Sequence, residues 1–265
     1  MTTLQIDPHH EAHAEPLRGK SVVISGGTTG IGKATALRLA QEGARVFIFG
    51  RHERELGEAL EEIRATGGEA HGVTADQART ADVRRVFHEA DARVGGCDIL
   101  INNAAVSADS VDQTDIEQVR YVLDTNLLGY MACVHEAINR MKRRASADGN
   151  ANRGAHAHIV NVGSMSADLR EAGGEIYAAT KAAIQAFSES LRKTANKHGV
   201  RVTLIEPGAV ATPMQEKSPE EERRKIEAME MLLPDDVARC VMYCLTQPQR
   251  VDVVSVQIRP LKQLI

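Results

Sequence analysis

A tyrosine and a lysine four positions apart, with a serine upstream, form the most informative chemical set in the sequence. Tyr177 and Lys181 end the motif Tyr-Ala-Ala-Thr-Lys, and Ser164 closes Asn-Val-Gly-Ser thirteen positions before the tyrosine. The pattern of Glu175–Lys197 predicts a helix, so Tyr177 and Lys181 leave the same side of it. A free phenol has a pKa of ~10, and a nearby ammonium favours its ionised form. Tyr177 can therefore exchange a proton with a carbonyl or alcohol oxygen that Ser164 holds by a hydrogen bond.

Tyr-x-x-x-Lys on its own is more typical of an ordinary surface helix than of a catalytic site. The position of Ser164 favours chemistry, because it follows Ala157–Val162, an apolar run that predicts a buried strand. In open α/β sheets, ligands bind beyond the carboxyl ends of the strands. The serine is therefore expected at a ligand-binding edge.

A glycine-containing turn near the start of the chain has the order of a phosphate-binding element. Lys20–Ser25 predicts a buried strand, and Lys33–Gln41 has the spacing of a helix packed on one face. Between them, Gly26 permits a sharp turn, while Gly30 and Gly32 allow close approach of the backbone. The start of a helix offers unpaired N–H groups to phosphates. The spacing differs from the usual dinucleotide fingerprint, so a plain glycine loop is the alternative reading.

Arg51 favours NADP over NAD as the dinucleotide. It follows Ala44–Phe49, a second predicted strand, at the point where an acidic residue would bind the ribose hydroxyls of NAD. No acid stands at positions 50–52, and a planar guanidinium suits the oxygens of a 2′-phosphate. A solvated arginine at a helix start is the alternative, and Glu53 is the residue that could reverse the preference for NADP.

Several motifs in order make the chain resemble the short-chain dehydrogenase/reductase family from about Lys20 to Thr212. Besides the glycine turn and the Ser-Tyr-Lys set, they are Asn102–Ala105, Asn126 within Thr-Asn-Leu-Leu-Gly, and Pro207–Thr212. The family's fold is a doubly wound parallel sheet with helices on both faces. The alternation of predicted strands and helices agrees with that α/β architecture.

The resemblance implies a role for each matching residue. Tyr177 would be the acid/base, Lys181 would lower its pKa and hold the nicotinamide ribose, Ser164 would orient the carbonyl, and Asn126 would support a water that links Lys181 to solvent. The residues expected to bind the cofactor are Gly26, Thr28, Gly30, Ile31, Gly32, Arg51, Asp76, Asn102, Ala104, Tyr177, Lys181, Pro207, Gly208, Val210 and Thr212.

Three minor members of the set have alternative readings. Asn126 could merely bend a long helix, and Asn102 could stabilise the sheet, because asparagine often bonds to nearby backbone. Asp76 is expected beside the adenine, yet Gln77 follows it where the family pattern usually has an apolar residue.

Length and composition fit one catalytic domain. The 265 residues are enough for a single Rossmann-type domain from residue 20 to residue 265, preceded by a flexible tail over residues 1–19. His9, His10 and His13 lie in this tail and are expected to be disordered rather than to bind metal. A net charge of −4 gives no reason to expect nucleic acid or a membrane surface.

No apolar run approaches the ~18 residues of a membrane span, and no signal-peptide core precedes the domain. The four cysteines lack metal-site spacing, so no metal site is predicted. Their number fits a reducing cytoplasm. By resemblance, the helices near Asp115–Arg144 and Glu175–Lys197 would build a homodimer or homotetramer.

Two segments depart from the regular alternation. Ala145–Ala157 is longer than the usual ~2–6 residue connection and predicts a surface insertion. Residues 209–232 are expected to form a substrate lid, whose methionines would either shape an apolar pocket or pack the lid onto the core.

The end of the chain gives a hint about substrate. Leu233–Ala238 and Val251–Ile258, with Arg259–Gln263 after them, resemble NADP-dependent 3-hydroxy acid and serine dehydrogenases. The sequence therefore predicts an NADP(H)-dependent oxidoreductase of a carbonyl or secondary alcohol, with NAD(H) as the other cofactor. The alternatives are a nonenzymatic NADP-binding regulatory protein on the same fold and a nicotinamide-assisted lyase or epimerase.

Overall fold

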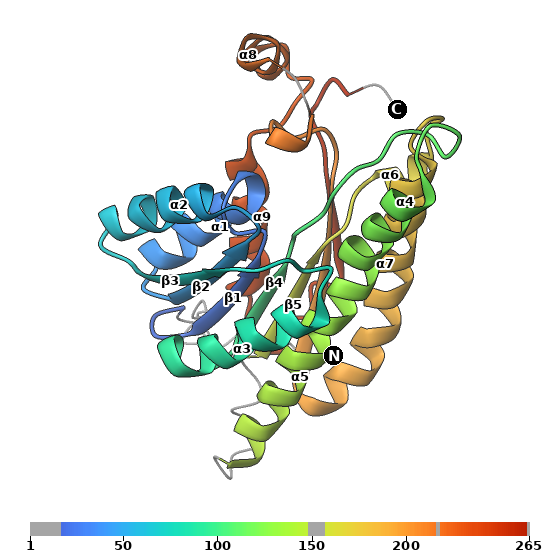
Figure 1. Cartoon of the computed structure of the whole chain (residues 1–265). Coiled ribbons are helices and arrows are strands. Elements are labelled where there is room, and N and C mark those ends of the chain that lie inside the picture. Colours follow the sequence, from blue (N-terminus) through green and yellow to red (C-terminus); the bar gives the residue numbers. More distant parts are fainter. Residues whose placement is uncertain (1–16, 148–156, 216–217, 264–265) are drawn as a thin grey trace, which may run out of the picture.

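Seven parallel strands form the centre of the molecule (Figure 1). The computed structural model describes residues 17–147, 157–215 and 218–263. Strand order is β3-β2-β1-β4-β5-β6-β7. The chain adds β2 and β3 on one side of β1 and then β4 to β7 on the other, so the strand order reverses between β1 and β4. This order confirms the predicted doubly wound α/β fold. The strands are β1 (Ser21–Ser25), β2 (Arg45–Gly50), β3 (Glu69–Thr74), β4 (Ile99–Asn102), β5 (Ala157–Val162), β6 (Val200–Pro207) and β7 (Ser255–Ile258).

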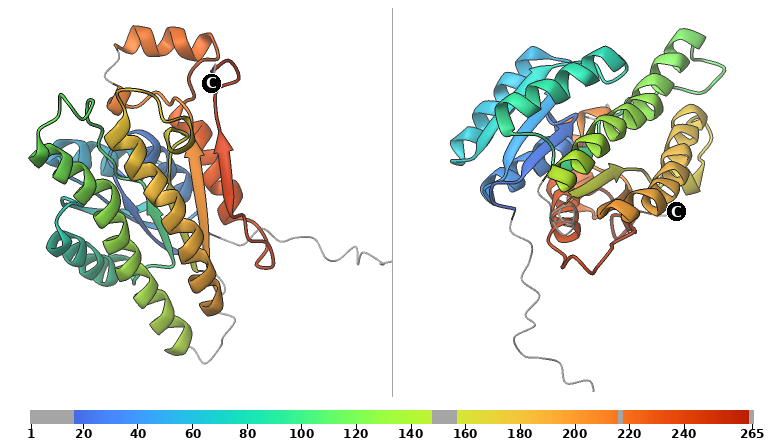
Figure 2. Two further views of the ribbon diagram at one scale, coloured as in Figure 1. Left: turned by 90° about the vertical axis from the view of Figure 1, so that its right-hand side faces the viewer. Right: turned by 90° about the horizontal axis from the view of Figure 1, so that it is seen from below.

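Helices cover both faces of the sheet (Figures 1 and 2). One face carries α1 (Gly30–Gln41), α2 (Glu53–Ala65) and α9 (Pro234–Leu245), and the other carries α3 (Thr80–Val94), α4 (Ile116–Leu123), α5 (Gly129–Ala147) and α7 (Glu175–Ala195). Short segments complete the described part of the chain: α6 (Ser166–Leu169), α8 (Pro219–Glu227), a π-helix (Asp124–Leu128) and two 3-10 turns (Asn196–His198 and Pro213–Gln215). In Figure 1, α8 lies at the top, away from the helices that cover the sheet.

Alternation along the central strands builds a separate apolar core on each face. In β1, Val22 and Ile24 pack with residues of α1, α2 and α9, whereas Val23 packs on the opposite side with residues of α3 and α5. Phe47 and Phe49 of β2 join the second core. Because side chains of a strand point alternately to the two faces, a strand covered on both sides must be apolar throughout.

Three element boundaries differ from the sequence-based expectations. α1 begins at Gly30 rather than at residue 33, because the Lys33 amide already bonds the Thr29 carbonyl at 3.1 Å. α7 ends at Ala195 and tightens into the 3-10 turn. β2 runs from Arg45 to Gly50, one residue later than the predicted strand Ala44–Phe49.

Residues 115–144, where the sequence predicts a long helix or a pair of helices, form α4 and α5 joined by the π-helix, and α5 continues to Ala147. Most of the predicted insertion, residues 148–156, lies outside the described residues, as do residues 1–16 of the predicted tail. Leu17 is 6% exposed and packs in the core with α1 and α9, and the Gly19 amide bonds the Gly43 carbonyl. The ordered domain therefore includes residues 17–19.

Candidate active site

A cavity of about 1270 Å³ lies along the carboxyl edge of the sheet. Its walls come from the segments that follow β1 through β6, as expected for a ligand site in an open α/β sheet. It brings together most of the predicted site residues, namely Gly26, Thr28, Gly30, Ile31, Arg51, Asp76, Ala104, Ser164, Tyr177, Lys181, Pro207, Gly208, Val210 and Thr212. Gly32, Asn102 and Asn126 lie behind this lining.

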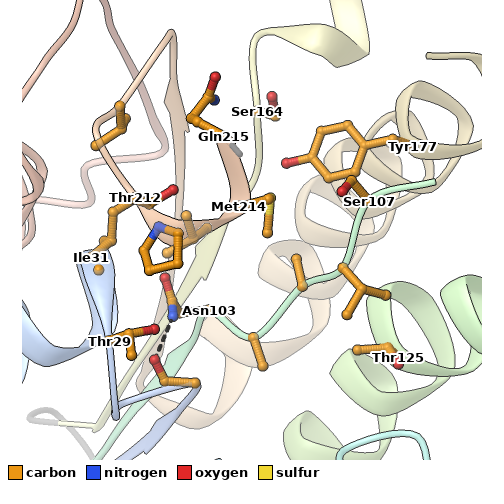
Figure 3. Close-up of a pocket in the computed structure, with 18 of the residues that line it drawn as sticks. Thr29, Ile31, Asn103, Ser107, Thr125, Ser164, Tyr177, Thr212, Met214 and Gln215 are labelled. Carbon is orange, nitrogen blue, oxygen red and sulfur yellow. Dashed lines mark hydrogen bonds between the residues drawn. The ribbon is translucent and has the colours of Figure 1, made fainter. Parts of the chain in front are cut away.

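Tyr177 and Ser164 face the same part of the cavity (Figure 3). Ser164 follows β5 by two residues, and its Oγ donates to Ser166 Oγ and accepts from the Ser166 amide, both at 3.1 Å. Tyr177 lies in the first turn of α7, and its hydroxyl points into the cavity. Two hydroxyl groups from separate elements can thus reach one substrate oxygen.

The buried Lys181 side chain lies beside the ring of Tyr177. The lysine is 2% exposed, its Nζ donates to the Val162 carbonyl at 2.9 Å, and the same Nζ lies 5.6 Å from the centre of the Tyr177 ring. The Tyr130 hydroxyl donates to this carbonyl at 3.0 Å, and the Tyr130 ring centre is 5.3 Å from Nζ. Two aromatic faces and one carbonyl therefore hold the ammonium in place.

Burial dominates the protonation of both groups. Desolvation lowers the pKa of Lys181 from 10.5 to about 7. Desolvation also raises the pKa of Tyr177 above 10.0, although a hydrogen bond with Ser164 acts in the opposite direction. The expected lowering of the phenol pKa is thus not produced by the protein's own groups, because desolvation of the phenol outweighs the favourable contacts.

Asn126 is fully buried in the π-helix. Its Oδ1 accepts from the Val106 amide at 2.9 Å, and its Nδ2 donates to the Val106 carbonyl at 2.8 Å and to Thr180 Oγ1 at 3.2 Å. The side chain therefore joins the loop after β4 to the helix that carries Tyr177 and Lys181. It does more than bend a helix.

The glycine turn forms a cradle that side chains would fill. A Cβ on Gly26 would lie 2.9 Å from the Ala104 Cα, and one on Gly32 would lie 2.1 Å from the Gly26 carbonyl oxygen. Gly30 has φ +52°, and a Cβ there would lie 3.1 Å from Thr212 Cγ2, on the opposite wall. The turn and the first turn of α1 thus leave bare backbone facing the cavity, which fits a pyrophosphate.

Arg51 and Asp76 meet at one end of the cavity through a tyrosine. Arg51 Nη1 donates to the Tyr121 hydroxyl at 2.6 Å, and that hydroxyl lies 3.2 and 3.3 Å from the two carboxylate oxygens of Asp76. The guanidinium carbon is 5.6 Å from the centre of the Tyr121 ring. A cation thus lies where β2 ends, with further N–H groups available for an anion.

The family model of the short chain dehydrogenases matches residues 20–223. The chain belongs to this family. An uncharacterized oxidoreductase of Staphylococcus epidermidis is 33% identical over 245 residues, covering 92% of this chain and 98% of that protein. An uncharacterized oxidoreductase of Staphylococcus aureus is 30% identical over the same length and shares. The protein is therefore an oxidoreductase of the short-chain dehydrogenase family.

Solved structures of this family share the fold. A 3-ketoacyl-(acyl-carrier-protein) reductase from Brucella melitensis, complexed with NADH, gives a TM-score of 0.81 at 26% identity, covering 94% of this chain and all of that one. A short chain dehydrogenase from Burkholderia cenocepacia, in complex with NADP, gives 0.79 at 25% identity, covering 92% and 98%. These neighbours hold different nicotinamide dinucleotides, so the likeness leaves the cofactor preference open.

Asn102, which the sequence predicts as a cofactor contact of this short-chain dehydrogenase, lies behind the cavity lining. Asn102 is buried and bonds within the sheet, to the Tyr130 carbonyl at 3.0 Å and to Asn161 Oδ1 at 3.2 Å. Asn103 lines the cavity instead, and its Nδ2 bonds the carbonyls of Ser25 and Gly26. The sheet-stabilising alternative for Asn102 therefore describes its contacts, because its strand position points it into the core.

The two ends of the predicted lid, residues 209–232, pair with each other. Val210 and Leu232 form a parallel bridge, supported by bonds from the Leu232 amide to the Ala209 carbonyl and from the Ala211 amide to the Leu232 carbonyl. Met214 lines the cavity, whereas Met231 is 4% exposed and packs inward. Met214 and Met231 thus take one each of the two roles that the sequence left open, whereas Met229 is 45% exposed and lies outside the cavity lining.

Several site residues carry no motif and were missed from the sequence. Tyr121 and Tyr130 belong to none of the motifs recognised in the sequence. Val106 contributes only its backbone, and Gln263 Oε1 accepts from the Ala209 amide at 3.1 Å. Gln77 gave a signal, as a polar residue at a position expected to be apolar, and Gln263 belongs to the ending that resembles 3-hydroxy acid dehydrogenases.

Within the ranges that the structure describes, no three His, Cys, Asp or Glu side chains gather as a metal site. None of the described helices combines the length and apolar character that a membrane crossing requires.

Proposed function

We propose that the protein is an NADP(H)-dependent oxidoreductase that interconverts a carbonyl compound and a secondary alcohol, with Tyr177 as acid/base. The observation that carries this proposal is that the Tyr177 and Ser164 hydroxyls face one cavity, with the buried Lys181 Nζ 5.6 Å from the centre of the Tyr177 ring. The glycine cradle opens into the same cavity, so a dinucleotide can reach from the cradle to the hydroxyls.

The residues divide the proton chemistry among them. A bound nicotinamide would supply or accept the hydride. During reduction, Tyr177 donates its proton to the substrate oxygen as negative charge develops there, and Ser164 donates a hydrogen bond to the same oxygen. The positive charge of Lys181 stabilises the phenolate that remains. Asn126 keeps α7 and the loop after β4 in register and, by resemblance, supports the water that returns the proton.

Arg51 supports the preference for NADP(H) over NAD(H). Its guanidinium lies at the end of β2, and Tyr121 holds one nitrogen while the others can fork onto a phosphate. Asp76 is separated from Arg51 by the Tyr121 hydroxyl, so the cation is not neutralised by a direct ion pair. The remaining cofactor contacts are proposed as the sequence predicts them, and Asn103 adds a polar side chain at the cavity wall.

Substrate class, location and assembly are further parts of the proposal. The ending that resembles 3-hydroxy acid dehydrogenases places Gln263 in the cavity wall, which supports small hydroxy or keto compounds, 3-hydroxy acids among them. Exposed apolar side chains on α4, the π-helix and α5 support a homodimer or homotetramer: Ile116, Leu123, Leu128 and Met131. We propose a cytoplasmic location on the cysteine usage alone.

A spectrophotometric panel tests the reaction class. NADPH absorbance is followed with ketones and β-keto acids, and NADP⁺ reduction is followed with secondary alcohols and 3-hydroxy acids. The proposal expects consumption matched one-to-one by product. Product formation without net change of cofactor would instead identify a lyase or epimerase, and tight NADPH binding without any turnover would favour the regulatory alternative.

A further inference from the structure

Gln77 lines the cavity and places a buried carboxamide among three elements of the site. The residue is 3% exposed, and it follows Asp76 in the segment that joins β3 to α3. Its Nε2 donates to the Thr125 carbonyl at 2.9 Å and to the Ala104 carbonyl at 3.4 Å, and its Oε1 lies 3.8 Å from the Cys133 thiol. A buried carboxamide is costly unless it is bonded, so these contacts have structural consequences.

The strongest of these bonds goes to the π-helix. In an α-helix, the Gly129 amide would bond the Thr125 carbonyl four residues back. Here the Gly129 amide bonds the Asp124 carbonyl, five residues back, and Gln77 bonds the Thr125 carbonyl. Gly129 also makes room, because a Cβ there would lie 2.5 Å from Gln77 Cγ. The side chain of Gln77 therefore supports the change of helical pitch.

The weaker bond goes to the loop that Asn126 holds. Asn126 follows Thr125 in the π-helix, and both polar atoms of its side chain bond the backbone of Val106. Ala104, the second acceptor of Gln77, lies two residues before Val106 in the same loop. One carboxamide thus bonds both sides of the Asn126–Val106 contact.

We propose that Gln77 is a positioning residue that acts through Asn126, by holding the π-helix and the loop after β4 at the spacing that Asn126 requires. Its effect on turnover rests on the proposed function, whereas its effect on the Asn126–Val106 contact does not. Gln77→Met keeps the length and the unbranched shape but removes both donors, which leaves two buried carbonyls without this partner.

Hydrogen exchange of the Val106 amide tests the positioning without any substrate. Gln77→Met should speed exchange of this amide about tenfold or more, since loss of one buried hydrogen bond has effects of this order. Cys133→Ala removes only the weak contact at Oε1 and should leave the rate unchanged. Val122→Ala creates a cavity in α4, two residues before the π-helix, and serves as the control for plain destabilisation. Unchanged exchange in Gln77→Met, or an equal rise in Val122→Ala at matched melting temperature, would overturn the proposal.

A double-mutant cycle with Asn126→Ala tests the kinetic consequence. Gln77→Met alone should lower kcat about tenfold with little change in KM for NADPH, and it should lower kcat no further in the Asn126→Ala background. Independent, multiplying losses would contradict action through Asn126. If the wild-type protein shows no turnover in the substrate panel, the proposed function fails, while the exchange measurement still decides the role of Gln77.

Discussion

Lys181 is an amine buried beside the phenol of Tyr177, at a cost in desolvation. The ammonium is buried against Val162 and two tyrosine rings, and desolvation lowers its pKa to about 7. Near neutral pH, the group is therefore close to the midpoint of its titration. A residue that both carries and releases a proton near neutrality suits a site that returns a proton to Tyr177 in each cycle.

The burial of Lys181 predicts a pH-dependent stability. Its pKa is lower in the folded protein (about 7) than in the unfolded chain (10.5), so between these values the unfolded chain binds the extra proton. The free-energy cost of burying the charged ammonium is therefore full below pH 7 and disappears as the pH rises to 10.5. The free energy of unfolding increases over this window.

Lys181→Met removes this cost. Relative to wild type, the variant should gain about 2–3 kcal/mol more in the free energy of unfolding at about pH 6 than at about pH 9. Urea unfolding at the two pH values measures the difference. The same relative stability at both values would show that Lys181 titrates normally in the folded protein.

Arg51 makes a prediction about cofactor choice. Arg51→Ala should weaken NADPH binding about 10- to 100-fold and NADH binding less than about twofold, because only NADPH carries the 2′-phosphate that the guanidinium would bind. Titration of intrinsic cofactor fluorescence measures both affinities. Arg54→Ala is a matched control, since Arg54 also lines the cavity but pairs with Glu55 and Glu58. Equal losses for the two cofactors would remove the assigned phosphate contact.

At the scale of elements, the first βα turn depends on close backbone contact. The helix begins at Gly30, and Gly32 packs against the Gly26 carbonyl so tightly that any side chain must move the turn. The π-helix plays a comparable part on the other side of the cavity, where its altered pitch turns Asn126 inward. Local departures from regular geometry therefore flank the site on both sides.

Gly32→Ala should lower NADPH affinity at least about tenfold and reduce the melting temperature, because the added Cβ would meet backbone rather than a flexible side chain. Gly57→Ala, in the middle of α2 with open space around its Cβ position, is the control. It should keep NADPH affinity and gain about 0.5–1 kcal/mol of stability. Normal NADPH binding by Gly32→Ala would show that the turn is not the cofactor cradle.

Much of this arrangement follows from the sequence, and the exceptions have physical causes. Apolar β-branched runs predicted β1, β2, β5 and β6, since a buried parallel strand needs such residues on both faces. The motifs led to Tyr177, Lys181 and Ser164 because their chemistry requires fixed residue types. The π-helix has no distinctive composition, and Tyr121, Gln77 and Val106 are chosen by tertiary contacts. Asn102 lies behind the cavity wall while Asn103 lines it, since strand alternation decides which neighbour faces the cavity.

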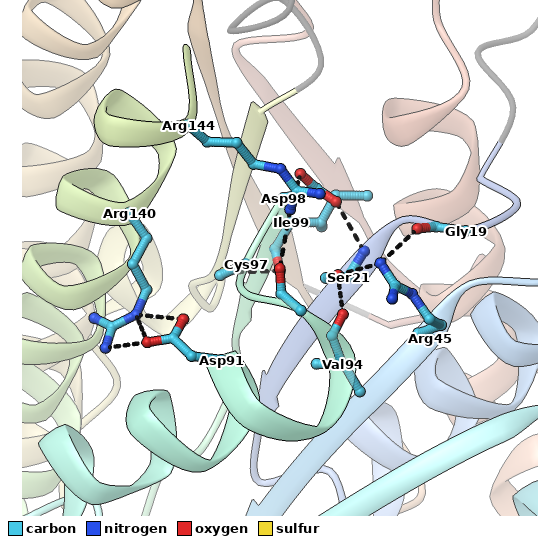
Figure 4. Close-up of polar contacts among 11 residues, drawn as sticks. Gly19, Ser21, Arg45, Asp91, Val94, Cys97, Asp98, Ile99, Arg140 and Arg144 are labelled. Carbon is cyan, nitrogen blue, oxygen red and sulfur yellow. Dashed lines mark hydrogen bonds and ion pairs between the residues drawn. The ribbon is translucent and has the colours of Figure 1, made fainter. Parts of the chain in front are cut away.

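At the scale of the whole molecule, the amino and carboxyl ends of the parallel strands differ in their contacts. At the amino edge, Asp98 accepts from the Ser21 amide and pairs with Arg144, while Arg45 donates to Ser21 Oγ and to the Gly19 carbonyl (Figure 4). These contacts tie β1, β2, β4 and α5 together. At the carboxyl edge, the strands end in the cavity, where glycines and hydroxyls leave space for ligands. The polar contacts hold the amino ends of the strands together, and the carboxyl ends leave a cavity in which a ligand can bind.

Replacement of Tyr177 by phenylalanine is the most direct measurement of the central claim. The substitution keeps the ring beside Lys181 and removes only the hydroxyl, so NADPH affinity should stay within about twofold while kcat falls by at least about 100-fold. Both quantities are measured on one preparation with the substrate identified by the panel. Near-normal turnover by Tyr177→Phe would contradict the assignment of Tyr177 as the acid/base.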